Sequence, residues 1–253
     1  MKITLLGTAG SLISNNKGCP AILINDDLLL DCGEGTTQKL IQLNCIKNIK
    51  TICITHLHND HFLGTFSLLW HYWLNQRKED LNIIGPPQLK STFETILELT
   101  HTPEGMMASC KVNYNELNET NTVQTIKKNY EIRYISMEHG FPAFAYRIEG
   151  NGKSFCYSGD TRPTENLNKI AQDCDLLVCE CTLPDDMYEF AHEHFHCTPS
   201  DVGKIADAVN AKKLILTHIS SFFLDRLDEF KKIAEKHFNK EVIIAEDLME
   251  LEL

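Results

Sequence analysis

Three histidines and an aspartate lie in one short stretch, ITHLHNDHFLG, at His56, His58, Asp60 and His61. Imidazole and carboxylate groups without a thiolate suit Zn²⁺ or a similar divalent metal as ligands. The chain has only 11 histidines among 253 residues, so chance crowding explains the stretch poorly. Side chains two residues apart in an extended loop point to the same side. The spacing therefore predicts that His56 and His58 bind one metal ion, while Asp60 and His61 turn toward a second.

Two metal ions need more ligands than this stretch supplies, and the other candidates lie at the ends of predicted strands. His139 follows EIRYISM, Asp160 ends FCYSGD, and His218 ends KKLILT. Site residues are often carried by loops at strand ends, because the sheet holds them rigidly. Each residue alone has a structural alternative, but together the three complete a two-metal site. Asp160 is placed to bridge the two ions.

The elements that must position these residues recur in two halves of the chain. In each half, the second strand of a hairpin ends at an aspartate beside a glycine: Asp31 precedes Gly33, and Asp160 follows Gly159. A helix and an apolar strand come next in both halves. The first half is expected to contain strands over 2–7, 20–26, 28–33 and 50–56 and helices over 36–44, 62–74 and 88–99. The second half is expected to contain strands over 131–137, 144–150, 153–160, 175–182, 212–218 and 241–247 and helices over 164–172, 198–210 and 223–238.

This weak internal repeat predicts an α/β (α+β) fold in four layers, αββα, with two β-rich sheets face to face and helices outside. The two similar halves would span about 1–128 and 129–253. No linker divides them, so residues 1–253 are expected to form a single domain.

Composition excludes several classes of protein. The formal net charge of −11 repels nucleic acid, which counts against a protein that simply coats RNA or DNA. The ten cysteines contain no CxxC pair, so they are expected to be reduced and buried rather than to bind zinc. No apolar run is long enough for a secretion signal or a membrane span. We therefore expect a cytoplasmic protein without membrane association.

Longer motifs give the sequence a family resemblance. THLHNDHFLG is similar to the signature of the metallo-β-lactamase fold, and DCGEGT with GDTRP resembles its ribonuclease Z branch, the tRNA 3′-processing endonucleases. LLGTAGS, IIGPPQLKSTFETIL, EHGFPAFAYRI, LLVCECT, FHCTPSD and LILTHIS also fall in the order seen in that branch. The resemblance covers most of the chain. It implies metal-assisted hydrolysis of a phosphodiester such as the 3′ trailer of precursor tRNA.

The resemblance also implies a role for each site residue. His196 would assist the leaving group, Glu180 would orient His196, and Asp60 would additionally orient the nucleophile. The cofactor would be two Zn²⁺ per chain, with Mn²⁺ or Fe²⁺ as alternatives. One zinc would be held by His56, His58 and His139, the other by Asp60, His61 and His218, and Asp160 would bridge them.

The sequence departs from ribonuclease Z in ways that leave the substrate open. Only a hairpin separates His139 from Asp160, where bacterial ribonuclease Z usually carries a long arm that grips tRNA. Phe222 lies where an arginine is usual, and the segment after DCGEGT lacks a basic, proline-containing stretch. A small phosphodiester or cyclic nucleotide is therefore an alternative substrate, unless a partner subunit of a homodimer supplies the grip. Lactone, thioester or β-lactam hydrolysis by the same fold is a second alternative, and a non-catalytic binding protein is a third.

The remaining histidines have simpler interpretations. His192 and His194 alternate with His196 in AHEHFH. A third metal site is an alternative there, but we expect two solvated neighbours beside one functional residue.

Overall fold

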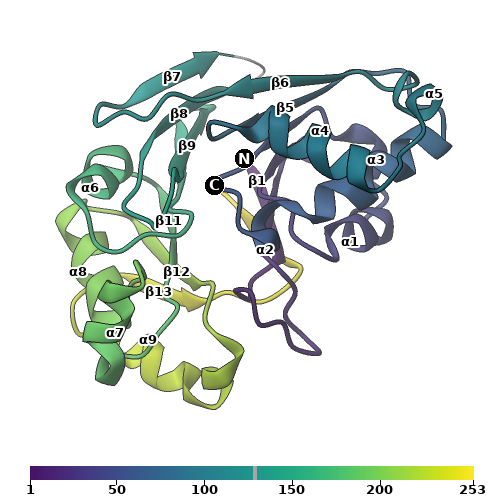
Figure 1. Cartoon of the computed structure of the whole chain (residues 1–253). Helices are drawn as coiled ribbons and strands as arrows, with labels where there is room; N and C mark the ends of the chain where they lie inside the picture. Colours follow the sequence, from purple (N-terminus) through teal and green to yellow (C-terminus); the bar gives the residue numbers. More distant parts are fainter. Residues whose placement is uncertain (128–129) are drawn as a thin grey trace.

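Two seven-stranded sheets face each other in the computed structural model, which describes residues 1–127 and 130–253 (Figure 1). The first sheet has the order β14-β1-β2-β3-β4-β5-β6 and the second the order β13-β12-β11-β10-β9-β8-β7. The first sheet consists of β1 (Lys2–Gly7), β2 (Ala21–Ile24), β3 (Leu28–Leu30), β4 (Thr51–Cys53), β5 (Leu81–Gly85), β6 (Val112–Glu116) and β14 (Met249–Glu252). The second consists of β7 (Gln124–Lys127), β8 (Glu131–Ser136), β9 (Phe144–Gly150), β10 (Lys153–Tyr157), β11 (Leu176–Glu180), β12 (Lys213–Thr217) and β13 (Glu241–Ile244).

Helices cover the outer face of each sheet (Figure 1). Those of the first half are α1 (Thr36–Gln42), α2 (Asn59–Phe62), α3 (Gly64–Leu74), α4 (Leu89–Leu99) and α5 (Glu104–Met107), with the 3₁₀ turn η1 (Ile46–Asn48). Those of the second half are α6 (Glu165–Ala171), α7 (Tyr188–Glu193), α8 (Pro199–Ala208) and α9 (Leu227–Glu235), with η2 (Asp185–Met187) and η3 (Ser221–Arg226). None of the described helices is long and apolar enough to cross a membrane.

Both faces of the central strands of each sheet are buried, which produces three apolar layers. Successive side chains of a strand point to opposite faces. In β3, Leu28 and Leu30 pack between the sheets, while Leu29 packs under the helices of the first half. In β11, Val178 packs between the sheets and Leu177 under the helices of the second half. The predicted four-layer αββα sandwich is confirmed, and all ten cysteines, which lie within the described ranges, are buried free thiols.

Several predicted elements differ from the structure, among them the helix expected over 223–238, whose first part is the 3₁₀ turn η3 and whose second part is α9. The strand expected over 50–56 ends at Cys53, because the amide of Thr55 bonds to the side chain of Asp31 instead of a strand. The helix expected over 62–74 is two helices, α2 and α3. The strand expected over 241–247 ends at Ile244 and is not the last one, since β14 follows it.

The strand β14 ties the end of the chain to its beginning. It pairs antiparallel with β1 at the edge of the first sheet. The N-terminal ammonium of Met1 donates to the carbonyl of Leu253 at 3.0 Å, and the amide of Leu253 donates to the carbonyl of Met1 at 3.1 Å. The sequence analysis did not predict this pairing, because the two strands lie at opposite ends of the sequence and no short loop connects them.

Parallel strands bring one edge of both sheets together. Strands β3 to β6 are parallel to one another, and so are β10 to β13. The carboxyl ends of parallel strands meet at the same edge of a sheet, which is where α/β proteins place their ligands. Loops that leave β3, β4, β10, β11 and β12 therefore lie side by side at this edge.

Candidate metal centre

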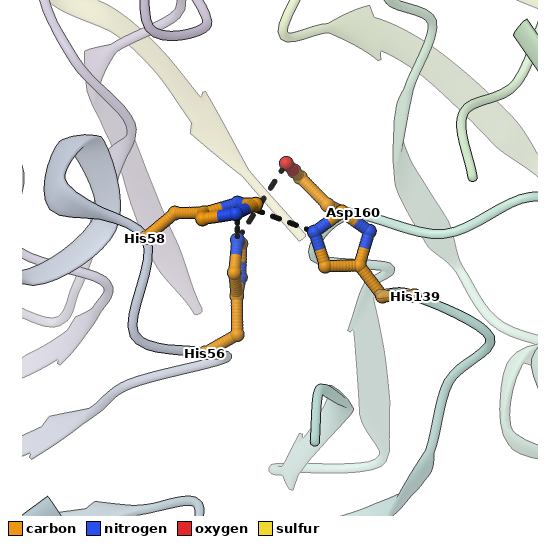
Figure 2. A group of neighbouring side chains, drawn as sticks. All are labelled: His56, His58, His139 and Asp160. Atoms are coloured by element: carbon orange, nitrogen blue, oxygen red, sulfur yellow. Dashed lines mark hydrogen bonds and ion pairs between the residues drawn. The ribbon is translucent and has the colours of Figure 1, made fainter. Parts of the chain in front are cut away.

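The side chains predicted to bind metal converge at that common edge. Ligand atoms gather in groups whose members all lie within 4.8 Å of one another. Figure 2 shows the first group, with His56 and His58 entering from the loop after β4 and His139 and Asp160 from the opposite half. The groups are His56, His58, His139 and Asp160; Asp60, His61 and His218; and Asp160, His196 and His218.

Imidazole nitrogens face one another in the first group. His56 Nε2 lies 3.0 Å from His58 Nδ1, and His139 Nε2 lies 3.2 Å from the same nitrogen. Asp160 Oδ2 lies 3.7 Å from His56 Nε2. Three imidazoles and one carboxylate oxygen therefore surround one small volume.

The second group approaches the other oxygen of the same aspartate. Asp160 Oδ1 lies 3.4 Å from both His61 Nε2 and His218 Nε2. Asp60 Oδ2 lies 3.5 Å from each of those nitrogens. The two carboxylate oxygens of Asp160 thus face different groups, as a ligand shared by two ions would.

The donor set fits a pair of borderline divalent metals. Both carboxylate oxygens of Asp60 and Oδ1 of Asp160 are buried, and none accepts a hydrogen bond within the described part of the chain. Buried carboxylate oxygens without a partner are costly. Bound cations would satisfy Asp160 Oδ1 and Asp60 Oδ2, and nitrogen and oxygen ligands without thiolate form a set that Zn²⁺ accepts.

Hydrogen bonds around the centre fix which imidazole nitrogen faces inward. Asp31 Oδ2 accepts from His61 Nδ1 at 2.7 Å, so Nε2 of His61 points into the second group. Thr55 Oγ1 donates to Asp31 Oδ2 at 3.0 Å and accepts from His56 Nδ1 at 3.0 Å. Thr182 Oγ1 accepts from His218 Nδ1 at 2.9 Å. Outer contacts of this kind orient metal-binding histidines and raise their basicity.

Asp31 is a functional residue that sequence analysis did not assign to the site. It is fully buried, and it also accepts from the amide of Thr55 at 2.7 Å and from Tyr157 at 3.0 Å. The repeated pattern of an aspartate beside a glycine at a hairpin end contained the signal, because its second instance is Asp160.

Replacing Asp31 with asparagine is expected to weaken zinc binding by roughly 10–100-fold, because the amide cannot accept all four hydrogen bonds and leaves His61 less firmly oriented. Asparagine is the suitable change, since Asp31 has φ 58° and asparagine tolerates that conformation. Competition with a fluorescent zinc chelator measures the affinity, and Asp228→Asn on the exposed surface of α9 is the control. Unchanged affinity would show that Asp31 does not orient the ligand.

Charges hold the carboxylates of the centre ionised. Burial would raise the pKa of Asp60, but its contact with His218 and the charge of His61 lower it to about 2. Burial would lower the pKa of His61, but the carboxylates of Asp160 and Asp31 raise it well above the usual value. Carboxylates bind metal in the ionised state.

Two glycines let backbone segments pack closely around the loop that carries His56, His58 and His61. A Cβ on Gly64 would lie 1.9 Å from the carbonyl oxygen of Gly33, so any larger residue would push α3 away from the loop after β3. Gly159 has φ 58°, and a Cβ there would lie 2.9 Å from Thr55. This left-handed residue turns the chain so that Asp160 points toward the other half.

Glu180 holds His196 beside the centre. Glu180 Oε1 accepts from His196 Nδ1 at 2.9 Å and from the amide of Thr161 at 2.9 Å. Its Oε2 accepts from Thr182 Oγ1 at 2.7 Å and from the amide of Cys197 at 3.2 Å. Burial would lower the pKa of His196, but the charge of Glu180 and this hydrogen bond raise it to about 9. The raised pKa favours the protonated form of His196.

The neighbouring histidines point elsewhere. His192 Nε2 donates to Asp201 Oδ2 at 2.8 Å, and the ring of His194 stacks on Phe190 with centroids 4.0 Å apart. Neither belongs to a metal-ligand group among the described residues. Asp201 also accepts from the amide and hydroxyl of Thr198 in a capping box at the start of α8.

Zinc is expected to stabilise the metal-free protein and raise its Tm by roughly 5–10 °C at about 100 times the Kd. A ligand at that excess adds about 2.7 kcal/mol, and about 1 kcal/mol shifts the Tm of a chain of this size by about 2–4 °C. Differential scanning calorimetry measures the shift. Mg²⁺ prefers oxygen ligands and should produce a smaller one. Equal effects of the two ions would contradict a site of this composition.

Comparison with known proteins adds a family match. Residues 27–219 match the model of a beta-lactamase superfamily domain. Ribonuclease Z of Methanosarcina acetivorans is 30% identical over an alignment of 306 positions that covers all of this chain and 98% of the relative. Ribonuclease Z of Archaeoglobus fulgidus is 29% identical and is covered to 97% of its length. Both alignments are longer than the chain, so these relatives have residues that it lacks.

Solved structures agree with this match. Human tRNase Z, short form (ELAC1), is 28% identical with a TM-score of 0.83, covering 100% of this chain and 99% of that one. The metallo-beta-lactamase fold protein YhfI from Bacillus subtilis is 22% identical with a TM-score of 0.81, covering 99% of this chain and 98% of that one. At that lower identity the likeness to YhfI concerns the fold alone.

Proposed function

Because this chain belongs to the metallo-beta-lactamase superfamily and is ribonuclease Z-like across its full length, we propose that it hydrolyses RNA phosphodiester bonds such as those of the 3′ trailer of precursor tRNA. It is a metal-dependent hydrolase of this fold. The observation that carries the proposal is the placement of the Glu180–His196 pair next to Asp160, whose oxygens face two separate ligand groups.

We propose that the ligand groups hold two zinc ions. His56, His58 and His139 would hold one ion, and Asp60, His61 and His218 the other, with Asp160 between them. Two such ions supply a nucleophilic water at neutral pH and neutralise charge on the phosphoryl oxygens.

The residues of the chain then act on protons and orientation. Asp60 Oδ1 is buried without a hydrogen bond among the described residues, so it can accept one from the attacking water. A ring nitrogen of His196 lies within 4.8 Å of an oxygen of Asp160 and a nitrogen of His218. From this position His196 donates a proton to the departing oxygen as that oxygen gains charge. Glu180 keeps the imidazole turned toward the centre and stabilises its charged form.

A smaller phosphodiester is the second candidate substrate. Between His139 and Asp160 the chain has only the hairpin of β9 and β10, which turns at Asn151 and Gly152. No long insertion stands there to hold a tRNA body. Similarity to ribonuclease Z favours precursor tRNA as the substrate. The relatives have residues that this chain lacks, and that difference favours the smaller phosphodiester.

One panel of substrates on zinc-loaded protein tests the proposal. It compares precursor tRNA with a 3′ trailer, a chromogenic phosphodiester, a cyclic nucleotide and a lactone. Cleavage of the trailer next to the discriminator base is the expected result. Hydrolysis of only the small diesters would replace tRNA with the second candidate, and a preference for the lactone would overturn phosphodiester hydrolysis. Size-exclusion chromatography in the same buffer shows whether active protein is a homodimer, whose partner chain could help to hold tRNA.

A further inference from the structure

A rim of flat side chains borders the metal centre next to His139. The ring of Phe141 lies with its centroid 5.3 Å from that of His139 and 4.3 Å from that of His58. The ring of Phe195 lies 6.2 Å from His139 on centroids, and the guanidinium carbon of Arg162 lies 5.1 Å from the centroid of Phe195. All three side chains of this rim, Phe141, Phe195 and Arg162, are partly exposed.

Core packing does not explain the two phenylalanines. Neither Phe141 nor Phe195 belongs to an apolar cluster of the described chain, or to the partly buried residues packed against one. Two aromatic rings thus remain partly open to solvent while they contact residues of the metal centre.

Phe195 lies just after α7 in a backbone conformation that is strained for a bulky residue. Its φ is 62°, in the left-handed region that a bulky residue rarely adopts. Two amides bond back to α7, in the pattern that ends a helix at a left-handed residue: the amide of Phe195 donates to the carbonyl of His192 at 3.3 Å, and the amide of His196 to that of Ala191 at 2.8 Å. Strain of this kind clusters at functional sites, where the surrounding structure enforces it.

Charge at the rim is nearly balanced. Arg162 Nε donates to Glu138 Oε2 at 2.8 Å, so its cation is partly neutralised, although 41% of the side chain is exposed. Together with a net charge of −11, this pairing leaves little long-range attraction for a polyanion. Aromatic rings and guanidinium planes nonetheless bind nucleobases by stacking, whatever the base.

We propose that Phe141, Phe195 and Arg162 form a stacking platform for the unpaired base of the nucleotide next to the scissile phosphate, which makes single-stranded nucleotide ends the substrate class. The inference rests on the proposed phosphodiesterase function. A base that lies flat on the rim must be unstacked from its neighbours, so duplex nucleic acid is excluded.

The test compares two chromogenic diesters with the same leaving group on zinc-loaded enzyme. One is the 4-nitrophenyl ester of thymidine 5′-phosphate, and the other is its abasic analogue. Phe195→Leu is expected to raise KM for the ester with the base by roughly 5–100-fold, while KM for the abasic ester, kcat and zinc content stay unchanged. Phe195→Tyr keeps a ring and should keep the wild-type preference. Phe190→Leu, at an exposed ring on α7, is the matched control.

Binding of thymidine 5′-phosphate and of abasic sugar phosphate, measured by calorimetry, separates the two proposals. If wild-type enzyme hydrolyses both esters with equal KM, or if Phe195→Leu affects them equally, the platform is overturned and phosphodiester hydrolysis stands. If neither ester is hydrolysed, the proposed function fails. Calorimetry then tests the stacking platform by itself. The platform is supported if wild-type protein binds thymidine 5′-phosphate more tightly than the abasic sugar phosphate and Phe195→Leu loses that difference. Equal binding of the two ligands to wild-type protein overturns it.

Discussion

Replacing Asp160 with asparagine is expected to lower kcat/KM for phosphodiester hydrolysis by roughly 10³-fold or more and to reduce bound zinc below two ions per chain. Asp160 Oδ2 approaches the first ligand group and Oδ1 the second. Asparagine keeps the shape but has one oxygen and no charge, so it cannot serve both groups. Metal ions stabilise the charge of the transition state by several kcal/mol, and each 1.4 kcal/mol lost costs about tenfold in rate.

Elemental analysis and a chromogenic phosphodiester measure these two effects on the same preparation. Asp228→Asn, on the exposed surface of α9, is the matched control and should retain both metal and activity. An Asp160→Asn protein that keeps two zinc ions and near-normal turnover would show that Asp160 is not shared between them.

Replacing His196 with alanine is expected to slow hydrolysis of an RNA diester by roughly 10²–10⁴-fold, the usual contribution of a general acid. A 4-nitrophenolate leaving group needs no proton, so a 4-nitrophenyl diester should lose much less. The physical basis is the contact of His196 Nδ1 with the buried carboxylate of Glu180, which keeps a protonated imidazole beside Asp160.

His194→Ala provides the control for that substitution, because His194 is exposed and stacks on Phe190. It should leave both substrates unaffected. Equal losses on both diesters would argue against proton donation by His196. Loss of zinc in His196→Ala would instead assign this histidine to the metal ligands, with Asp160 and His218.

Local patterns in the sequence predicted much of the site. His56, His58 and Asp60 follow an apolar strand within a few residues. A strand followed directly by several metal-binding residue types is recognisable without knowledge of the fold. The cap of α8 is equally local, because Thr198 and Asp201 lie three residues apart and satisfy each other. These features depend on neighbours in the chain.

Contacts between segments that lie far apart in the sequence could not be predicted from it. Asp31 acquires its role only when the loop after β3 meets His61, 30 residues further along the sequence. The short strand β14, with sequence MELE, alternates in burial between half-buried and exposed and gains its place by pairing with β1. No nearby residue signals any of these contacts. The proposal of a single domain with two similar halves, about 1–128 and 129–253, stays a prediction.

The pairing of β14 with β1 has a consequence for biosynthesis. Residues 249–252 occupy an edge of the sheet that residues 2–116 otherwise build. During vectorial translation that edge stays bare until the last of its strands leaves the ribosome, and bare edges recruit strands from other chains. The nascent polypeptide therefore passes through a period of exposure to aggregation, during which chaperones that shield strand edges would raise the yield of native enzyme.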